Sequence, residues 1–499
     1  MSKIVTGPKP SGPAGTDPAP SATIVLFGAA GALVKRLLMP SLYNLSLDGL
    51  LDDDTKILGV DIAQMSADDW KDGLGETIQS FTKDKGAEFH PDRIDQDVWN
   101  GLMDRADYLQ GDFSDAATFE AVAKRVGDRS AVFYLAVSSR FFGPVGEALG
   151  QAGLFQEPDG GFRRLIVEKP FGSDLASAKA LNKRLLAVAS EDQVYRIDHF
   201  MGKEPVQSIL ALRFANRLFA PLFDGRDVDR IEITAAETLG VEGRGAFYEP
   251  TGVVRDMVPN HMFQLLAMTA IDPPPSLDHS DLRDQSLALL QSIPALTPGD
   301  TVLGQYGAGT VNGNKITAYR ESKGVAVDSR TPTYVALKLT PKTDRWGGTP
   351  IYLRTGKCLA ARRTEIVVHF KAPEQDLFAD RRDGATDRIV ISIAPSHAVT
   401  FDILVKRPGP KETLAPATLE VSPEEIFGDK PNVGYETLLY DCLMGEKTLF
   451  QRADVIEEAW RIVDPILPEG AVEVHDYPAG SDGPKAAAAL IPQGWEPLS

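Results

Sequence analysis

The chain has 499 residues, 43% of them hydrophobic and 24% charged, which is enough apolar sequence for two packed domains. Acidic residues outnumber basic ones by 70 to 52, and the net charge of −18 argues against nonspecific binding to nucleic acid or to an anionic membrane. No apolar run reaches the ~18 residues of a membrane span. Two cysteines without metal-ligand spacing indicate no disulfide framework, no metal site and a reduced, cytoplasmic setting.

Residues 1–20 are dense in Pro, Gly and Ser, which predicts a disordered tail. From 21 to 198, short apolar segments alternate with stretches long enough for crossover helices. This alternation predicts a parallel, doubly wound sheet whose loops converge beyond the carboxyl ends of its strands. The predicted strands are 23–28, 56–61, 130–137, 163–170 and 193–198.

The first of these loops, "FGAAG", joins a strand to a helix. Two glycines there would let the backbone approach a diphosphate, and the N–H groups and positive end of the following helix would hold that anion. The G-x-x-G spacing also occurs in turns that bind nothing, so the pattern alone leaves both interpretations open. The candidate coenzyme contacts in this turn are Gly28, Ala29, Ala30, Gly31 and Leu33.

Charged residues follow the last two predicted strands. In "VEKPFG", Pro170 is expected to fix a cis or otherwise rigid turn that aims Lys169, the alternative being an ordinary exposed loop. In "RIDHFMGKE", Asp198, His199 and Lys203 lie at the junction of the two halves, where His199 and Lys203 would form a phosphate clamp. The alternative is a solvated helix start with Asp198 as its N-cap.

From 199 to 499 the predicted strands alternate apolar and polar residues and lie closer together. This pattern predicts an α+β domain with a mainly antiparallel sheet that is covered on one face. The strands are 230–238, 334–340, 351–357, 365–371, 388–395 and 399–407.

A helix is predicted over 252–268, with Pro259 in a first turn and a core-facing stripe at 262, 265, 266 and 269. His261 lies off that stripe, so it is either a structural histidine or, with a carboxylate to orient it, a general base. Farther along, "LRTGKCLAARRTE" carries Lys357, Arg362 and Arg363. These three form either a basic edge or part of a site for an anionic sugar.

Five segments in this order resemble glucose-6-phosphate dehydrogenase, and the resemblance covers 21–495. They are "EKPFG", "RIDHFMGKE", the R-D-x-x-x-N-H of 255–261, "LRTGK", and "GYETLLYDCLMGEKTLF" at 434–450. The resemblance implies a Rossmann-like dinucleotide-binding domain over 21–198. It also implies a substrate-binding and oligomerisation domain over 199–499, whose sheet forms the interface of a homodimer or homotetramer.

The implied reaction oxidises glucose 6-phosphate at C1 to 6-phosphoglucono-1,5-lactone with NAD or NADP, the first step of the oxidative pentose phosphate and Entner–Doudoroff routes. Matched residue by residue, His261 corresponds to the general base and Asp198 to the carboxylate that orients it. His199 and Lys203 match the phosphate-binding pair, and Lys169 matches the lysine between sugar and nicotinamide. Contacts to sugar hydroxyls are implied for Glu237, Glu249 and Lys357, although the family usually has Asp at 249.

Several positions depart from the family pattern. Ala30 and Ala32 replace a hydroxyl residue and an acid in the glycine turn, at an expected cost of about 1 kcal/mol. At the other positions, this chain has Ser138 and Ser139 where the family has two prolines, and Phe200 where it commonly has a phosphate-contacting Tyr. Pro259 and Ala394 each replace a Gln that is often seen. These departures leave open an active enzyme, a dehydrogenase of another aldose phosphate, or a weakened homologue that acts as regulator or subunit. Retention of the base, its acid and the phosphate clamp favours the first.

Asp61 ends the second predicted strand, where a carboxylate can bind a ribose 2′-hydroxyl and repel a 2′-phosphate. NADP-restricted relatives commonly place an Arg just after this strand, whereas here Ile, Ala and Gln follow. We therefore expect NAD to be used alongside or above NADP. The alternative is that Asp61 faces solvent and that Lys35 or Arg36 supplies the positive charge.

Overall fold

The computed structural model describes residues 17–84, 87–378, 387–427 and 433–498. Most of the tail predicted over 1–20 therefore lies outside the described residues. Ala19, however, is buried, and its N–H donates to the Leu50 carbonyl at 2.9 Å, so the packed chain begins before residue 21. Nowhere in these ranges is a helix both long and apolar enough to span a bilayer.

Six parallel strands form the first sheet, in the order β3-β2-β1-β4-β5-β6. Their bounds are β1 Thr23–Phe27, β2 Lys56–Asp61, β3 Ala106–Gln110, β4 Ala131–Leu135, β5 Arg163–Glu168 and β6 Val194–Ile197. Strand order reverses between β1 and β4, which opens a crevice beyond their carboxyl ends. β3 was not predicted, because its "ADYLQ" has no continuous apolar run.

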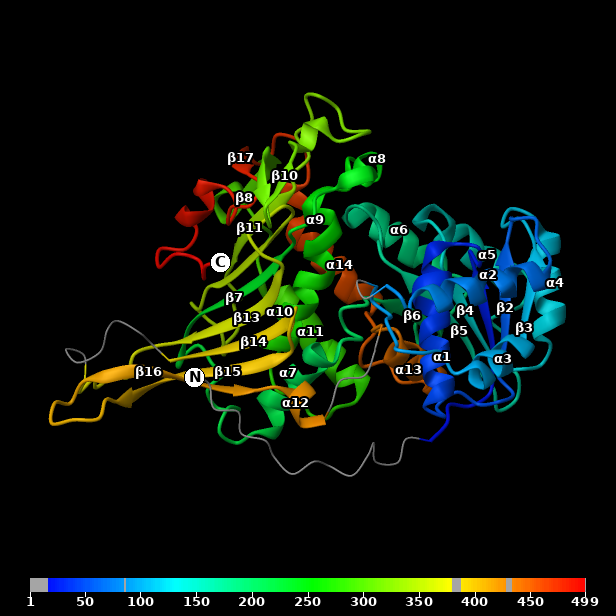
Figure 1. The fold of residues 1–499 in the computed structure, drawn as a ribbon, viewed down its shortest axis with the longest axis horizontal. Coiled ribbons are helices and arrows are strands. Elements are labelled where there is room, and N and C mark those ends of the chain that lie inside the picture. Colours follow the sequence, from blue (N-terminus) through cyan, green and yellow to red (C-terminus); the bar gives the residue numbers. More distant parts are fainter. Residues whose placement is uncertain (1–16, 85–86, 379–386, 428–432, 499) are drawn as a thin grey trace.

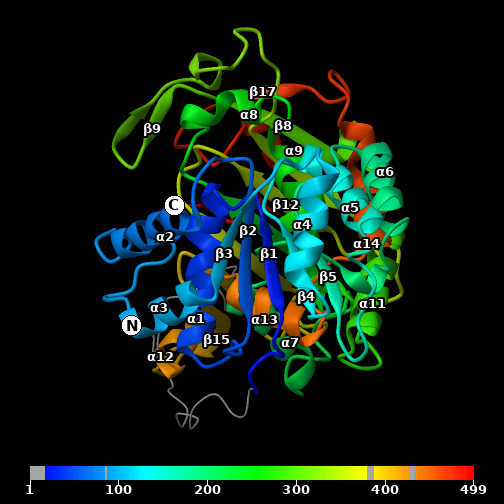
Figure 2. The same ribbon diagram turned by 90° about the vertical axis from the view of Figure 1, so that its right-hand side faces the viewer.

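Helices cover both faces of this sheet (Figure 2). One group is α1 (Met39–Leu47), α2 (Ala67–Ser80) and α3 (Gln96–Asp104), and the other is α4 (Ala116–Val126), α5 (Phe142–Gln151) and α6 (Leu175–Leu186). Two late helices complete these layers: α13 (Glu436–Met444) packs on α1, and α14 (Ala453–Val463) packs on α6. Arg164 ties α13 to β5 by donating to the Cys442 carbonyl at 2.6 Å. The domain predicted over 21–198 thus receives part of its cover from far along the chain.

The second sheet has nine strands in the order β16-β15-β14-β13-β7-β12-β11-β8-β17 (Figure 1). Their bounds are β7 Val228–Ala236, β8 Thr301–Gly307, β11 Tyr334–Leu339, β12 Ile351–Gly356, β13 Arg363–Phe370, β14 Arg388–Ala394, β15 Ala398–Lys406, β16 Leu414–Val421 and β17 Val474–Pro478. Only the β7–β12 and β17–β8 pairs are parallel. The missed strands include both edges, β16 and β17. β16 carries Pro416 and is half-exposed, so it lacks the apolar alternation that identifies a covered strand.

The helix predicted over 252–268 is three pieces: α9 (Gly252–Met257), a π-helical turn η5 (Val258–Met262) and α10 (Phe263–Ala270). Asn260, next to Pro259, has φ −109° and ψ −105°, which breaks the helix. The predicted stripe is buried, but so is every residue from 257 to 271, because α7 (Glu204–Ala215) and α14 also pack against these pieces. His261 is therefore buried, although it lies off the stripe.

Candidate active site

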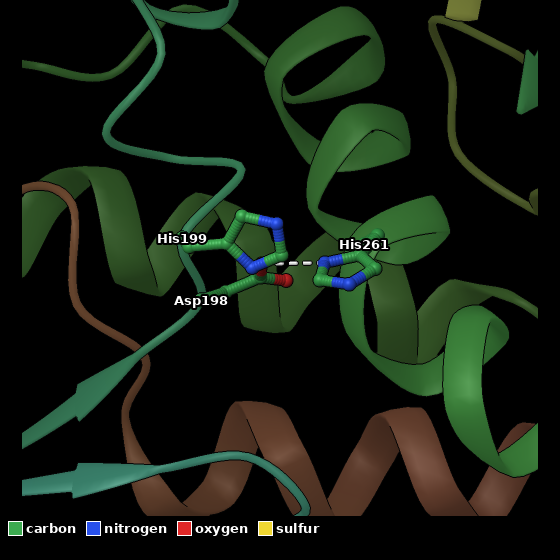
Figure 3. A group of neighbouring side chains, drawn as sticks. All are labelled: Asp198, His199 and His261. Carbon is green, nitrogen blue, oxygen red and sulfur yellow. Dashed lines mark hydrogen bonds and ion pairs between the residues drawn. The ribbon is translucent and has the colours of Figure 1, made fainter. Parts of the chain in front are cut away.

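Two segments that lie 63 residues apart bring Asp198 and His261 together (Figure 3). Asp198 follows β6, and His261 lies in the kinked turn η5. The Nδ1 atom of His261 is 2.5 Å from Oδ1 of Asp198, with 2% and 0% of the two side chains exposed. Because an ionised carboxylate only accepts hydrogen bonds, Nδ1 carries the proton, and Nε2 keeps the lone pair of a neutral ring.

Lys169 lies at the other nitrogen of this imidazole. Its Nζ is 2.7 Å from His261 Nε2 and 3.5 Å from Oδ1 of Asp256, and the peptide bond between Lys169 and Pro170 is cis. The ammonium donates to the Nε2 lone pair, so this lone pair faces the carboxyl end of β5. Asp256 was not singled out from the sequence, although its position in α9, five residues before His261, offered a signal.

Burial and charge set the protonation of the pair. Burial lowers the pKa of His261, and the nearby Asp198 opposes only part of that effect. Burial alone would raise the pKa of Asp198, but the hydrogen bond from His261 and the charge of Lys169 bring it below its usual range. A neutral imidazole beside an ionised carboxylate is the state that a general base needs.

Two donor side chains, His199 and Lys203, lie near this pair, and Arg362 lies near Lys203. The His199 ring is 4.9 Å from the His261 ring at 84°, and burial lowers the pKa of His199 well below its usual value. Burial also lowers the pKa of Lys203; the charge of nearby Glu88 opposes this effect, and the charge of the exposed Arg362 adds to it. Three such groups in one place form a surface that suits an anion.

The alternative that Asp198 caps a helix is wrong. Helix α7 begins at Glu204 with Lys203 as its N-cap residue. Asp198 instead accepts the backbone N–H of Phe200 at 3.0 Å with the same oxygen that contacts His261. Its other oxygen, Oδ2, is buried without a hydrogen-bond partner among the described residues.

Lys357 and Glu237 form a second pair, with Nζ 2.5 Å from Oε2. They follow β12 and β7, which are parallel neighbours, so both side chains leave the sheet at the same edge. Burial alone would raise the pKa of Asp256, but the charges of Lys169 and Lys357 lower it, which places this pair beside the Lys169 cluster. Glu249 accepts a hydrogen bond from the Tyr319 hydroxyl at 2.5 Å. In the described ranges no hydrogen bond or ion pair joins Glu249 to His261 or Lys169.

The glycine turn lies at the switch point of the parallel sheet. Gly28 has φ +89°, and a Cβ there would lie 2.4 Å from the Ala136 carbonyl oxygen, so the close approach of β1 to the end of β4 requires glycine. The Gly31 N–H is used within the turn, since it donates to the Gly28 carbonyl at 2.9 Å. The N–H groups of Ala32 and Leu33 begin the following helix and have no intrahelical acceptor. The turn therefore fits a diphosphate held at that first helical turn.

Asp61 is only partly exposed, and both of its carboxylate oxygens are hydrogen-bonded. Its Oδ2 accepts the Ala30 N–H at 3.0 Å, and its Oδ1 accepts the Ala63 N–H at 3.1 Å. The Ala30 N–H is consequently taken by the protein, and the carboxylate lies between the glycine turn and the end of β2. Ser138 and Ser139 lie exposed beyond β4, at the same end of the sheet.

Glu168 is a buried acid for which the sequence predicted no role. Its Oε1 accepts a hydrogen bond from the Tyr134 hydroxyl at 2.5 Å, and the Tyr435 hydroxyl also bonds to it. Burial raises the pKa of Glu168 to about 7, against the lowering effect of these hydrogen bonds. Because Lys169 follows directly, this network fixes the end of β5 that presents the lysine.

Comparisons with known proteins agree over nearly the whole chain. Residues 25–208 match the family model of the glucose-6-phosphate dehydrogenase NAD binding domain, and residues 210–495 match that of its C-terminal domain. Glucose-6-phosphate 1-dehydrogenase of Dickeya dadantii is 37% identical over 489 residues, covering 95% of this chain and 97% of the relative. That of Mycolicibacterium smegmatis is 38% identical over 482 residues, covering 94% and 95%.

Two solved structures share the fold. The crystal structure of glucose-6-phosphate 1-dehydrogenase from Mycobacterium avium has a TM-score of 0.82 at 36% identity and covers 96% of this chain and 99% of its own. A glucose-6-phosphate dehydrogenase in complex with glucose-6-phosphate has a TM-score of 0.86 at 27% identity, covering 97% and 99%. The six-stranded parallel sheet and the matches define an oxidoreductase with a nicotinamide-binding domain. Within that class, the chain belongs to the glucose-6-phosphate dehydrogenase family.

Proposed function

We propose that the chain oxidises glucose 6-phosphate at C1 to 6-phosphoglucono-1,5-lactone and transfers the hydride to NAD or NADP. The observation that carries this proposal is the buried His261–Asp198 pair, whose Nε2 atom faces Lys169 at the carboxyl end of the parallel sheet. Full-length relatives that bear the name glucose-6-phosphate 1-dehydrogenase support it.

In this mechanism His261 Nε2 takes the proton of the C1 hydroxyl while the hydride leaves C1. Without substrate, the Lys169 ammonium donates a hydrogen bond to Nε2, so the lysine must move aside when the C1 hydroxyl arrives. Asp256, 3.5 Å from this ammonium, can hold the lysine there. Asp198 keeps the ring oriented and stabilises the imidazolium that forms. The bound nicotinamide supplies the hydride acceptor.

Binding of the substrate is assigned to the cations around the pair. His199, Lys203 and Arg362 would hold the phosphate dianion, because charge-assisted bonds to such an anion are the strong ones. The sugar hydroxyls would contact Lys357, Glu237 and Glu249. Lys357 presents a donor and the two glutamates present acceptors, which matches the needs of hydroxyl groups.

For the coenzyme, we propose that NAD is used alongside or above NADP. Asp61 at the end of β2 supports this, because its carboxylate is fixed by two backbone N–H groups where it can meet a ribose hydroxyl. Comparing kcat/KM with the two coenzymes tests the proposal. A preference for NADP of more than about a hundredfold, close to 3 kcal/mol, would contradict it.

We also propose a homo-oligomer, a dimer or a tetramer, formed through the nine-stranded sheet, and a cytoplasmic location. The β15–β16 ribbon exposes Ile403, Val405, Leu419 and Val421 on one face, and it extends from the body in Figure 1. A second copy covering this ribbon would bury these side chains. Sedimentation of Val405→Lys tests the proposed oligomer, since the added charge should favour the monomer.

The proposed cytoplasmic location is supported by Cys358 and Cys442, which are buried and not joined by a disulfide.

The substrate is tested by comparing turnover on glucose 6-phosphate with turnover on mannose 6-phosphate and galactose 6-phosphate, with the product identified as the lactone. Preference for an epimer would indicate a dehydrogenase of another aldose phosphate. If no sugar phosphate were turned over, while the chain bound to an active family member and changed its rate, the regulatory alternative would replace this proposal.

A further inference from the structure

Phe200 contacts both members of the acid–base pair. Its ring stacks on the His261 imidazole with centroids 4.1 Å apart and planes 22° from parallel. Its backbone N–H donates to the Asp198 oxygen that also contacts His261. The same ring lies 4.4 Å from Nζ of Lys203. The Phe200 ring therefore touches the base and a cation of the anion site, while the backbone of the same residue binds the acid.

An aromatic face attracts a cation that approaches it, and the attraction grows where water is excluded. The His261 ring becomes a cation only after it takes the substrate proton, so the stack is stronger after proton transfer than before it. An interaction that strengthens in this way accelerates the chemical step.

Resting on the proposed function, we propose that Phe200 is a positioning residue that holds the His261 ring by stacking and stabilises its protonated form during the reaction. Phe200 touches His261 rather than the sugar C1, so it acts through the base. The hydroxyl that a tyrosine would carry at this position has no part in this role.

Several charged groups also face His261 and are kept constant in the test. Asp198 lies at Nδ1, Lys169 at Nε2, Asp256 behind Lys169, and His199 at the edge of the ring. None of these residues is changed when Phe200 is replaced. A difference in rate or pH profile between Phe200 variants therefore measures the effect of the aromatic ring.

The experiment compares Phe200→Leu, which keeps an apolar side chain but loses the ring, with Phe200→Tyr, which keeps the ring. Phe219→Leu is the matched control, because Phe219 stacks on Phe401 in the second sheet, with centroids 4.8 Å apart. We expect Phe200→Leu to lower kcat about tenfold and to move the acidic limb of kcat/KM to lower pH, because the imidazolium loses its partner. Phe200→Tyr should keep kcat and the limb within about twofold of the parent values.

If the acidic limb of the kcat/KM profile does not move in Phe200→Leu, and only KM or thermal stability changes, the proposal is overturned and Phe200 has only a packing role.

A second readout requires no turnover. In the NMR spectrum of histidine-labelled protein, assigned with His261→Asn among the seven histidines, the stacked ring should shift the His261 ring protons upfield. The signals should move downfield in Phe200→Leu but not in Phe200→Tyr. Unchanged signals would refute the stack, and an inactive parent protein with these shifts would refute only the proposed function.

Discussion

His261 Nδ1 and Asp198 Oδ1 are 2.5 Å apart, with almost no part of either side chain exposed. This contact fixes the tautomer in which Nε2 carries the lone pair that can accept a proton once the Lys169 ammonium moves aside. Replacing Asp198 by Asn keeps the volume but removes the charge that stabilises the imidazolium. We expect kcat to fall by about 10²-fold or more with little change in thermal stability. Steady-state kinetics measures the loss, and Asp272→Asn, which weakens a remote ion pair with Arg345, is the control.

The pKa of His261 also predicts the pH dependence of the reaction. Because burial lowers this pKa below 6.5, the ring stays neutral and able to accept a proton at pH values where a free histidine is already charged. The acidic limb of kcat/KM should therefore have its midpoint below pH 6.5. A pH profile with saturating coenzyme checks this, and a midpoint above about 7 would contradict the protonation state described for the pair.

Glu168 predicts a pH dependence of stability. Its pKa is raised from 4.5 to about 7, so the folded chain binds more protons than the unfolded chain between these values. Stability should therefore fall as pH rises through this window, by ~3 kcal/mol at most. Glu168→Gln removes the charge, so it should be more stable than the parent protein above pH 7 and equal to it below 4.5. Urea unfolding at both ends of the window measures this, with the exposed Glu120→Gln as control. Equal effects at both pH values would show that the buried carboxyl does not titrate there.

Gly28 is predicted to be irreplaceable for a packing reason. A Cβ would meet the Ala136 carbonyl oxygen at 2.4 Å, and φ +89° strains any other residue. Gly49 has a similar φ of +71° but nothing within 4 Å, so Gly49→Ala should lose only about 1 kcal/mol of stability. Gly28→Ala should lose several times more and weaken coenzyme binding. Equal melting temperatures for the two variants would show that the turn adapts.

Asp61 predicts a change in coenzyme preference. Asp61→Asn removes the charge that repels a 2′-phosphate, so kcat/KM with NADP relative to NAD should rise about tenfold. Asp52→Asn is the control, because Asp52 also accepts a backbone N–H, that of Asp54 at 2.8 Å, but precedes β2. Kinetics with both coenzymes measures the ratio. An unchanged ratio would mean that Asp61 serves only to fix the turn.

Continuous apolar strands made the parallel sheet predictable, since β1 and β4 are buried along their whole length. β3 and β16 lack that signal, and their places depend on neighbouring strands. The packing of α13 and α14 on the first sheet could not be predicted, because contacts such as Arg164 with Cys442 join residues 278 positions apart. Sequence periodicity reports local structure and carries no information on such pairs.

Site residues that lie in sequence motifs could be predicted, whereas contacts that depend only on the folded geometry could not. Asp198, His261 and Lys357 were singled out from ordered motifs, whereas Glu237, the partner of Lys357, was implied only by the family resemblance. The Phe200 stack could not be predicted, because it depends on how the kink at Asn260 turns His261. The contact of Lys169 with Nε2 likewise depends on how β5 ends beside η5.

The most direct test of the proposed activity follows nicotinamide reduction by absorbance in purified protein with glucose 6-phosphate, using NADP and NAD in parallel, for the parent chain and for His261→Asn. The proposed mechanism predicts reduction that falls by ~10³-fold in the variant while the protein remains folded and still binds the sugar phosphate. Reduction that persists in His261→Asn, or no reduction by the parent chain with either coenzyme, would contradict it.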